Sequence, residues 1–255
     1  MNSVKARIAK AGAVFSLIAF ALLCSLAAIA QPAGPGSVDR GASERAPSQP
    51  AVLVQAEAGN VTSLTITATK ITSRWQGYFG NVTGNITLGD ANNNLLYNWI
   101  DASPQGEIYA VNDSAVPEWG DVFCFNFTNN LSDGQPIVQH FNGTDLERTL
   151  GMDPSDSDGV DETFNRTYAG EFQVGSVTIG ATSGCSVVSL NVDDGYQEQT
   201  FNEVLLTDNR STIYTSLLEN SATGFQGAPV DFQLIVGENG DISEPSNYYF
   251  YVELT

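Results

Sequence analysis

The sequence predicts an all-β protein: a β-sandwich, built as one large domain or two packed β-subdomains, that follows a signal peptide and a flexible linker. Three observations predict this class. Short apolar runs alternate with polar residues at a period of two, turn-forming Gly, Asn and Asp separate the runs, and helical periodicity is almost absent. Hydrophobic residues make up 42% of the 255 residues, which is enough for a sizeable core.

Residues 1–30 are predicted to be a signal peptide. A basic start precedes an apolar run from Ala11 to Ala30, which ends in a small-x-small pattern before Gln31. Cleavage is expected after Ala30. Two alternatives stay open: a retained membrane anchor, because about 20 apolar residues can span a bilayer, and a pilin-type leader cut near Lys10. Residues 31–56 are rich in Pro, Gly, Ser and Ala and predict a disordered linker.

Residues 57–142 predict a first β-region. Its expected strands are 61–71, 95–100, 106–111, 121–128 and 136–141. The stretch from Ile71 to Trp99 has the pattern of a β-meander. A tight turn is expected at Gly80-Asn81 and a polar turn at residues 89–94, because these residues tolerate a positive φ.

Residues 143–162 predict an acidic loop with one short helix, Asp145 to Leu150. A second β-region is expected over residues 163–255, packed with the first as one domain. Its expected strands are 163–174, 176–179, 185–192, 200–207, 211–218, 230–236 and 247–254. Their spacing is typical of all-β sandwiches.

The charge balance excludes one class of partner. The chain has 10 basic and 29 acidic residues, a net charge of −19. Nucleic-acid binding depends on clustered Lys and Arg, so it is not expected here. An acidic surface favours solubility and cation binding. Self-association or contact with other cell-surface components is open, and membrane contact is expected only if the N-terminal segment is retained.

Two cysteines remain beyond the leader, where Cys24 lies. In an exported protein, Cys124 and Cys185 predict one disulfide. The bond would close a loop of about 60 residues and stabilise the fold by roughly 3–4 kcal/mol. Two buried free thiols are the alternative.

Nine Asn-x-Ser/Thr sequons predict a glycosylated exported surface. They are at Asn60, Asn81, Asn85, Asn112, Asn126, Asn130, Asn142, Asn165 and Asn209. Chance would place roughly three at this composition. Asn126 is the weakest candidate, because it shares a strand face with Cys124. Incidental matches on an Asn/Thr-rich β surface are the alternative.

The acidic loop contains the one suggested cofactor site, for calcium. Asp156, Asp158 and Asp161 could converge on a hard cation, and Gly159 permits a sharp bend. The full EF-hand pattern fails, because Pro154 occupies the position of its first acid. A solvated acidic loop is the alternative.

Aromatic residues suggest a second kind of site. Trp75 and Tyr78, in a set with Phe79, Trp99 and Trp119, could form a platform for glycans, although Trp in a β-sandwich more often belongs to the core. The sequence gives little indication of a catalytic site. His140 is the only histidine, no Gly-x-Ser-x-Gly elbow is present, and no glycosidase-type carboxylate pair stands out.

Four sequence blocks carry a family resemblance. They are WQGYFGNVTGNITL (75–88), FNEVLLTD (201–208), VDFQLIVGENG (230–240) and YYFYVEL (248–254). These blocks resemble an uncharacterised group of archaeal secreted proteins, and the resemblance implies a β-rich extracellular protein without an assigned activity. The layout of leader, flexible stretch and β-domain is also loosely similar to archaeal pili that assemble by donor-strand exchange.

These observations together predict a non-enzymatic, exported cell-surface glycoprotein with a structural or adhesive role, such as a filament subunit. In that role the apolar segment Ala51 to Gln55 is expected to complete the sheet edge of a neighbour. The alternative is a secreted carbohydrate-binding module.

Overall fold

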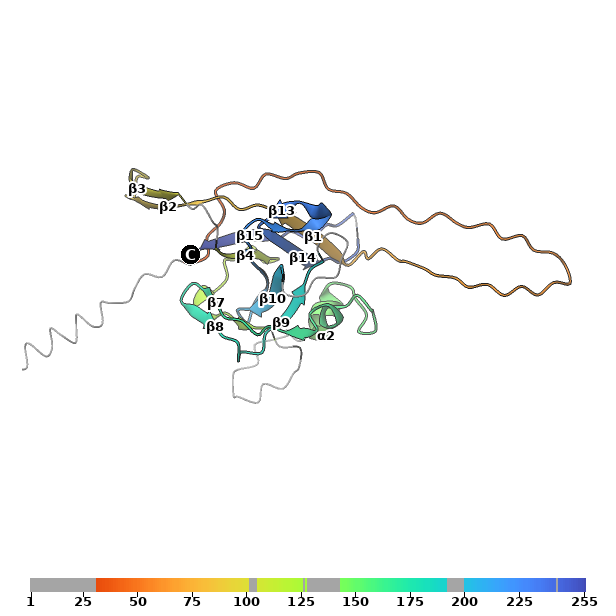
Figure 1. Ribbon diagram of the computed structural model, residues 1–255. Helices are drawn as coiled ribbons and strands as arrows, with labels where there is room; N and C mark the ends of the chain where they lie inside the picture. Colours follow the sequence, from red (N-terminus) through yellow and green to blue (C-terminus); the bar gives the residue numbers. More distant parts are fainter. Residues whose placement is uncertain (1–30, 101–104, 126, 128–142, 192–199, 242) are drawn as a thin grey trace, which may run out of the picture. The chain divides into compact units, whose positions relative to one another are not determined.

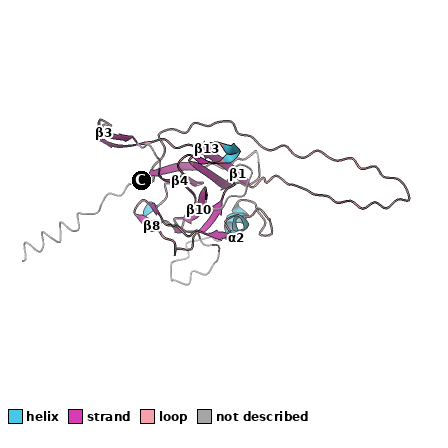
Figure 2. Ribbon diagram, in the orientation of Figure 1, coloured by secondary structure: helices cyan, strands magenta, loops and turns pink. Residues whose placement is uncertain are grey.

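The computed structural model describes residues 31–100, 105–125, 127, 143–191, 200–241 and 243–255 (Figure 1). Strands predominate and the helices are short (Figure 2). The all-β prediction is therefore confirmed, with the strands divided among several sheets; the sandwich arrangement stays a prediction. The predicted signal peptide and the strand expected at 136–141 lie outside the described residues.

One antiparallel sheet of seven strands organises the fold. Its order is β15-β4-β11-β10-β9-β6, and β5 pairs separately with β10. The strands are β4 (Gly106–Val111), β5 (Phe123–Cys124), β6 (Arg166–Thr167), β9 (Ser186–Ser189), β10 (Asn202–Thr207), β11 (Thr212–Leu217) and β15 (Tyr249–Leu254). Because β4 pairs with β15 and β11, the two predicted β-regions share this sheet.

Both faces of this sheet are apolar. Along β10, Val204 and Leu206 join one core cluster and Leu205 joins the other, as the alternation of a strand requires. The first cluster includes the hairpin of β7 (Phe172–Val174) and β8 (Val177–Ile179). The second includes β14 (Phe232–Gly237) and the helices α2 (Gly143–Thr149) and α3 (Val160–Thr163). This double coverage explains why strands such as β10 are apolar on both sides.

The predicted disulfide is present. Cys124 and Cys185 are bonded, with Cα atoms 4.8 Å apart, across a sequence separation of 61 residues. The bond lies against the first core cluster and ties β5 to the residue before β9. The disulfide therefore fixes a long loop directly to the core.

Two predictions about the first β-region were wrong. Residues 61–71 form no strand, and Leu64 and Ile66 are 56% and 81% exposed. Regular structure begins at Trp75, not near Glu57. An alternating pattern alone does not make a strand, because a strand also needs a hydrogen-bonded neighbour.

The expected pairing across Gly80-Asn81 was also wrong. β1 (Trp75–Gly80) pairs with β14, far along the chain, while β2 (Asn85–Gly89) pairs with β3 (Leu95–Ile100). The turn at residues 89–94 does join β2 to β3 as expected. Long-range packing of β1 against β14 thus overrides a locally plausible hairpin.

The predicted linker, the acidic segment and the strand expected at 121–128 each differ in part from the prediction. In the predicted linker, Ala33 forms an isolated bridge to Val252 and Pro32 is buried. The acidic segment contains the expected helix as α2 and also the start of α3, which was not predicted. Within the strand expected at 121–128, the described residues form β5, while residues 126 and 128 lie outside the described part of the chain. The other short elements are β12 (Ala222–Thr223), β13 (Pro229–Val230), η1 (Trp119–Asp121) and η2 (Phe225–Gly227).

Candidate functional site

The outer edge of β15 is one of the two edges of the central sheet, and the outer edge of β6 is the other. β15 pairs with β4 on one side, and on the other side its recorded partner within the described residues is Ala33 alone. The Val252 N–H donates to the Ala33 carbonyl at 2.8 Å, and the Ala33 N–H donates back at 3.1 Å. Backbone groups alternate in direction along an antiparallel strand, so those of Phe250 and Leu254 face the same edge. This edge can accept a further strand.

The chain that precedes β1 contains apolar residues that the rest of the described chain leaves exposed. Val52, Leu53 and Val54 are 87%, 87% and 55% exposed. No strand or bridge is assigned between residues 34 and 74, which Figure 1 shows as an extended trace. Backbone and side chains of this segment are therefore both available to another sheet.

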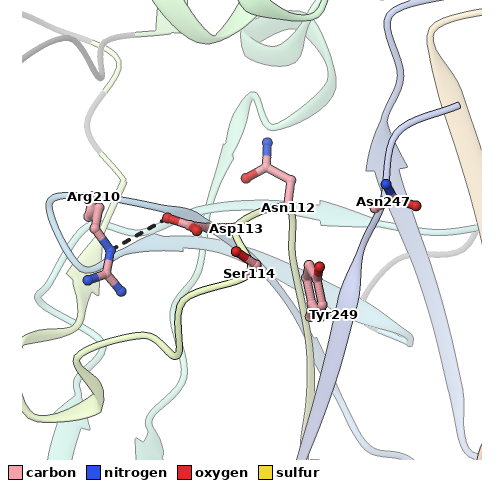
Figure 3. A pocket seen from close by; sticks show the side chains of 6 residues that line it. All are labelled: Asn112, Asp113, Ser114, Arg210, Asn247 and Tyr249. Carbon is pink, nitrogen blue, oxygen red and sulfur yellow. Dashed lines mark ion pairs between the residues drawn. The ribbon is translucent and has the colours of Figure 1, made fainter. Parts of the chain in front are cut away.

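A polar hollow of about 510 Å³ lies beside the first residues of β15 (Figure 3). Six residues line it, namely Asn112, Asp113, Ser114, Arg210, Asn247 and Tyr249. Arg210 forms an ion pair with Asp113, with Nε and Oδ2 3.6 Å apart, and its Nη2 donates to the Val116 carbonyl at 2.7 Å. Amide groups, an ion pair and the exposed ring of Tyr249 form a set that suits sugar hydroxyls and sugar faces.

A buried pair of carboxyl groups lies between β4 and β15. Glu107 and Glu253 are directly opposite each other and only 5% and 4% exposed. Glu253 accepts hydrogen bonds from the Tyr109 hydroxyl at 3.1 Å and from the Gly175 N–H at 2.9 Å. Burial, and then the charge of Glu253, raise the pKa of Glu107 to about 8, so Glu107 holds a proton at neutral pH.

This pair is a structural feature of the core. Neither surface hollow recorded in the described part of the chain is lined by Glu107 or Glu253. Sequence reasoning missed both acids, although Glu107 shares a strand face with Tyr109 and Val111, and that placement was the available signal.

The predicted calcium ligands are not gathered together. The Asp156 carboxylate accepts from the Asp153 N–H at 2.9 Å, and that of Asp158 accepts from the Thr72 hydroxyl. Both side chains therefore shape the loop. Asp161 belongs to a different set.

Asp161 lies with Glu147 and Glu162, whose carboxylate oxygens are all within 4.8 Å of one another. Glu147 is buried and accepts from the Val160 N–H at 3.0 Å, so it holds the start of α3. Burial and the hydrogen bond to Asp161 raise the pKa of Glu147. Calcium binding by Asp156, Asp158 and Asp161 stays a prediction; titration calorimetry that gives no heat with millimolar calcium would remove it.

The predicted glycan platform is packed into the fold. Trp75 donates its indole N–H to the Asp158 carbonyl at 2.8 Å and lies against Phe164, with ring centroids 6.1 Å apart. Tyr78 packs edge-on against Phe250 at 5.3 Å. Trp119 is buried in the first core cluster. Of the predicted set, Trp99 and Phe79 remain about half exposed.

Six of the nine sequons fall within the described residues, and none of these six is buried. Asn60, Asn81, Asn85, Asn112 and Asn165 are exposed, and Asn209 is partly exposed. Asn126, Asn130 and Asn142 lie outside the described residues. Every described sequon is therefore accessible to a glycosylating enzyme.

Comparison with known proteins gives no further guide. No family model matches the chain, and neither a curated protein nor a solved structure gives a significant match. Within the described residues, no helix has the length and apolar character needed to cross a bilayer.

Proposed function

We propose that this protein is a non-enzymatic, exported cell-surface glycoprotein with a structural or adhesive role, assembled with neighbouring copies by strand complementation. The observation that carries the proposal is the coexistence of two features: an extended apolar segment, and a sheet edge whose backbone groups at Phe250 and Leu254 have no recorded partner among the described residues. Accessible sequons and a disulfide-tied β-fold support export.

In this assembly, residues Ala51–Gln55 of one copy lie along the outer edge of β15 of the next. Backbone hydrogen bonds to Phe250 and Leu254 supply affinity, and alternate apolar side chains supply register. The single bridge from Ala33 occupies only one position of that edge, and Pro32 and Pro35 beside it limit its extension because proline lacks an N–H. A donor strand would therefore extend past this bridge or displace it.

Electron microscopy of the purified native protein at high concentration tests this mechanism. Filaments or linear chains are expected, and deletion of residues 51–55 should abolish them. A matched deletion of residues 43–47, in the same exposed stretch but with fewer apolar residues, should leave assembly intact. Monomers alone at high concentration would count against the mechanism.

Carbohydrate binding is the second candidate function, and the polar hollow around Tyr249 favours it over the predicted Trp75 and Tyr78 platform. A glycan array of the full chain is the test. Tyr249→Ala should remove any signal, whereas Phe225→Ala, which removes another half-exposed ring, should retain it. An array without binders would leave the structural role as the sole proposal.

A further inference from the structure

The β2–β3 hairpin carries an apolar face that stays half exposed in the described part of the chain. Ile86 lies opposite Trp99, and Leu88 lies opposite Tyr97, so the four side chains share one face. Ile86 and Trp99 are 46% and 50% exposed, and Leu88 and Tyr97 are 48% and 58% exposed. The rings of Tyr97 and Trp99 contact each other, with centroids 4.7 Å apart. We call these four residues the hairpin face.

The hairpin face belongs to none of the hydrophobic clusters of the described chain. β2 and β3 make their principal contacts with each other. The two half-exposed rings alone leave about 200 Å² of apolar surface in water. A two-stranded hairpin is marginally stable by itself, and a contiguous apolar patch on a surface marks an interaction site.

Charge narrows the choice of occupant. Between Arg74 and Asp101, Asp90 is the only charged residue, in a chain of net charge −19. The Asp90 carboxylate accepts from the N–H groups of Asn92 and Asn94, each at 2.9 Å, and so closes the turn. Two copies repel each other over most of their acidic surfaces, but they can approach at this neutral face. Anionic lipids or glycans would find no Lys or Arg on the hairpin.

The sequons leave the same face open. Asn85 belongs to β2 and, by the two-residue period, its side chain is on the opposite side from Ile86. Thr87 and its partner Asn98 share the side of Asn85. A glycan on Asn85, which rests on the proposed function, would therefore cover the back of the hairpin and leave the hairpin face bare.

We propose that the hairpin face is a homodimer contact, in which Trp99 and Tyr97 of one copy pack against the hairpin face of a second copy. A two-fold arrangement fits, because the same patch then serves both copies. Aromatic side chains at the centre of a small apolar contact supply most of its affinity. This contact is separate from strand complementation at β15.

Sedimentation equilibrium of the purified full chain over a wide concentration range tests the proposal. A reversible monomer–dimer equilibrium is expected, and it should strengthen with salt, because salt screens the repulsion between acidic copies. Trp99→Ala should weaken dimerisation at least tenfold. Phe225→Ala, a matched aromatic deletion at an exposed site outside the hairpin, should not change it.

Two further measurements distinguish a lost dimer contact from a loss of folding or of filament assembly. The melting temperature of Trp99→Ala should match the wild type, since Trp99 lies outside the core clusters, and the deletion of residues 51–55 should leave the dimer intact while it removes filaments. A protein that is monomeric at every concentration, or a dimer that Trp99→Ala does not weaken, would overturn the proposal. A monomer that binds glycans or vesicles through Trp99 would also overturn it.

Discussion

Replacing Glu107 by Gln is expected to stabilise the folded protein by an amount that grows with pH. Glu107 is buried directly opposite Glu253, and its Oε2 atom has no hydrogen-bond partner among the described residues. Burial and the neighbouring charge of Glu253 raise its pKa from 4.5 to about 8. Folding therefore requires a proton on Glu107 at pH values where the unfolded chain has released it.

The sign and size of this change in the free energy of unfolding follow from the linkage between proton binding and folding. Because the folded-state pKa is raised, the stabilisation from this proton is complete below about pH 4.5 and is lost as the pH rises to about 8. The loss is about 1.4 kcal/mol for each pH unit, or about 5 kcal/mol over the whole window. Gln has nearly the same shape and does not titrate, so the variant avoids this loss.

Urea unfolding of wild type and Glu107→Gln at a series of pH values is the assay. The difference in free energy of unfolding should be near zero at pH 4.5 and reach its largest value above pH 8. Glu171→Gln, at an exposed position, is the matched control and should follow the wild type throughout. A difference that does not vary with pH, or a variant that is less stable at pH 8, would refute the reasoning.

Three further substitutions test the packing of the core, the disulfide and the close contact between Gly106 and β15. Leu205→Ala removes a fully buried side chain and should cost about 2–5 kcal/mol in a urea titration; a loss below 1 kcal/mol would contradict the packing. Replacing Cys124 and Cys185 together by Ser should lower stability by about 4 kcal/mol by calorimetry, and an unchanged melting temperature would show that the bond does not form. Gly106 has a φ of +128°, and a methyl group there would meet the β15 backbone. Gly106→Ala should therefore lower the free energy of unfolding by at least about 1–3 kcal/mol. Gly120 has open space around it, so Gly120→Ala should leave the stability unchanged.

Strands of the central sheet could be predicted where a segment is strongly apolar and also alternates with a period of two. β4 matches its expected residues, and β10 and β15 fall within theirs, because alternation and strong apolar character act together. The disulfide could be predicted because two cysteines remain beyond the predicted leader. Helix α2 was predicted as a short helix over Asp145 to Leu150, whereas α3 in the same acidic stretch was not predicted.

Pairing between distant strands could not be predicted. The turn-like Gly80-Asn81 suggested a local hairpin, but the partner of β1 lies more than 150 residues away, in β14. Residues 61–71 have a strand pattern and no partner, which alternation cannot reveal. The closeness of Glu107 and Glu253 depends on a register between β4 and β15 that neither strand specifies alone.

The surroundings of the candidate site residues could not be predicted either, because they too depend on contacts between distant segments. Trp75 was a candidate for a surface glycan platform, with the core as the alternative, and it donates to the Asp158 carbonyl and packs on Phe164. Asp161 was expected to act with its sequence neighbours, but its carboxylate meets Glu147 from another helix. The hairpin face could have been found from the alternation in β2 and β3, had the absence of a covering element been known.

Mass spectrometry of the native protein, isolated from the cell surface and mapped peptide by peptide, tests the central claim most directly. The account predicts a chain that begins at Gln31, carries glycans on exposed sequons such as Asn81 and Asn85, and contains linked Cys124 and Cys185. Recovery of the protein from the cytoplasm, with residues 1–30 attached, bare sequons and reduced thiols, would contradict it.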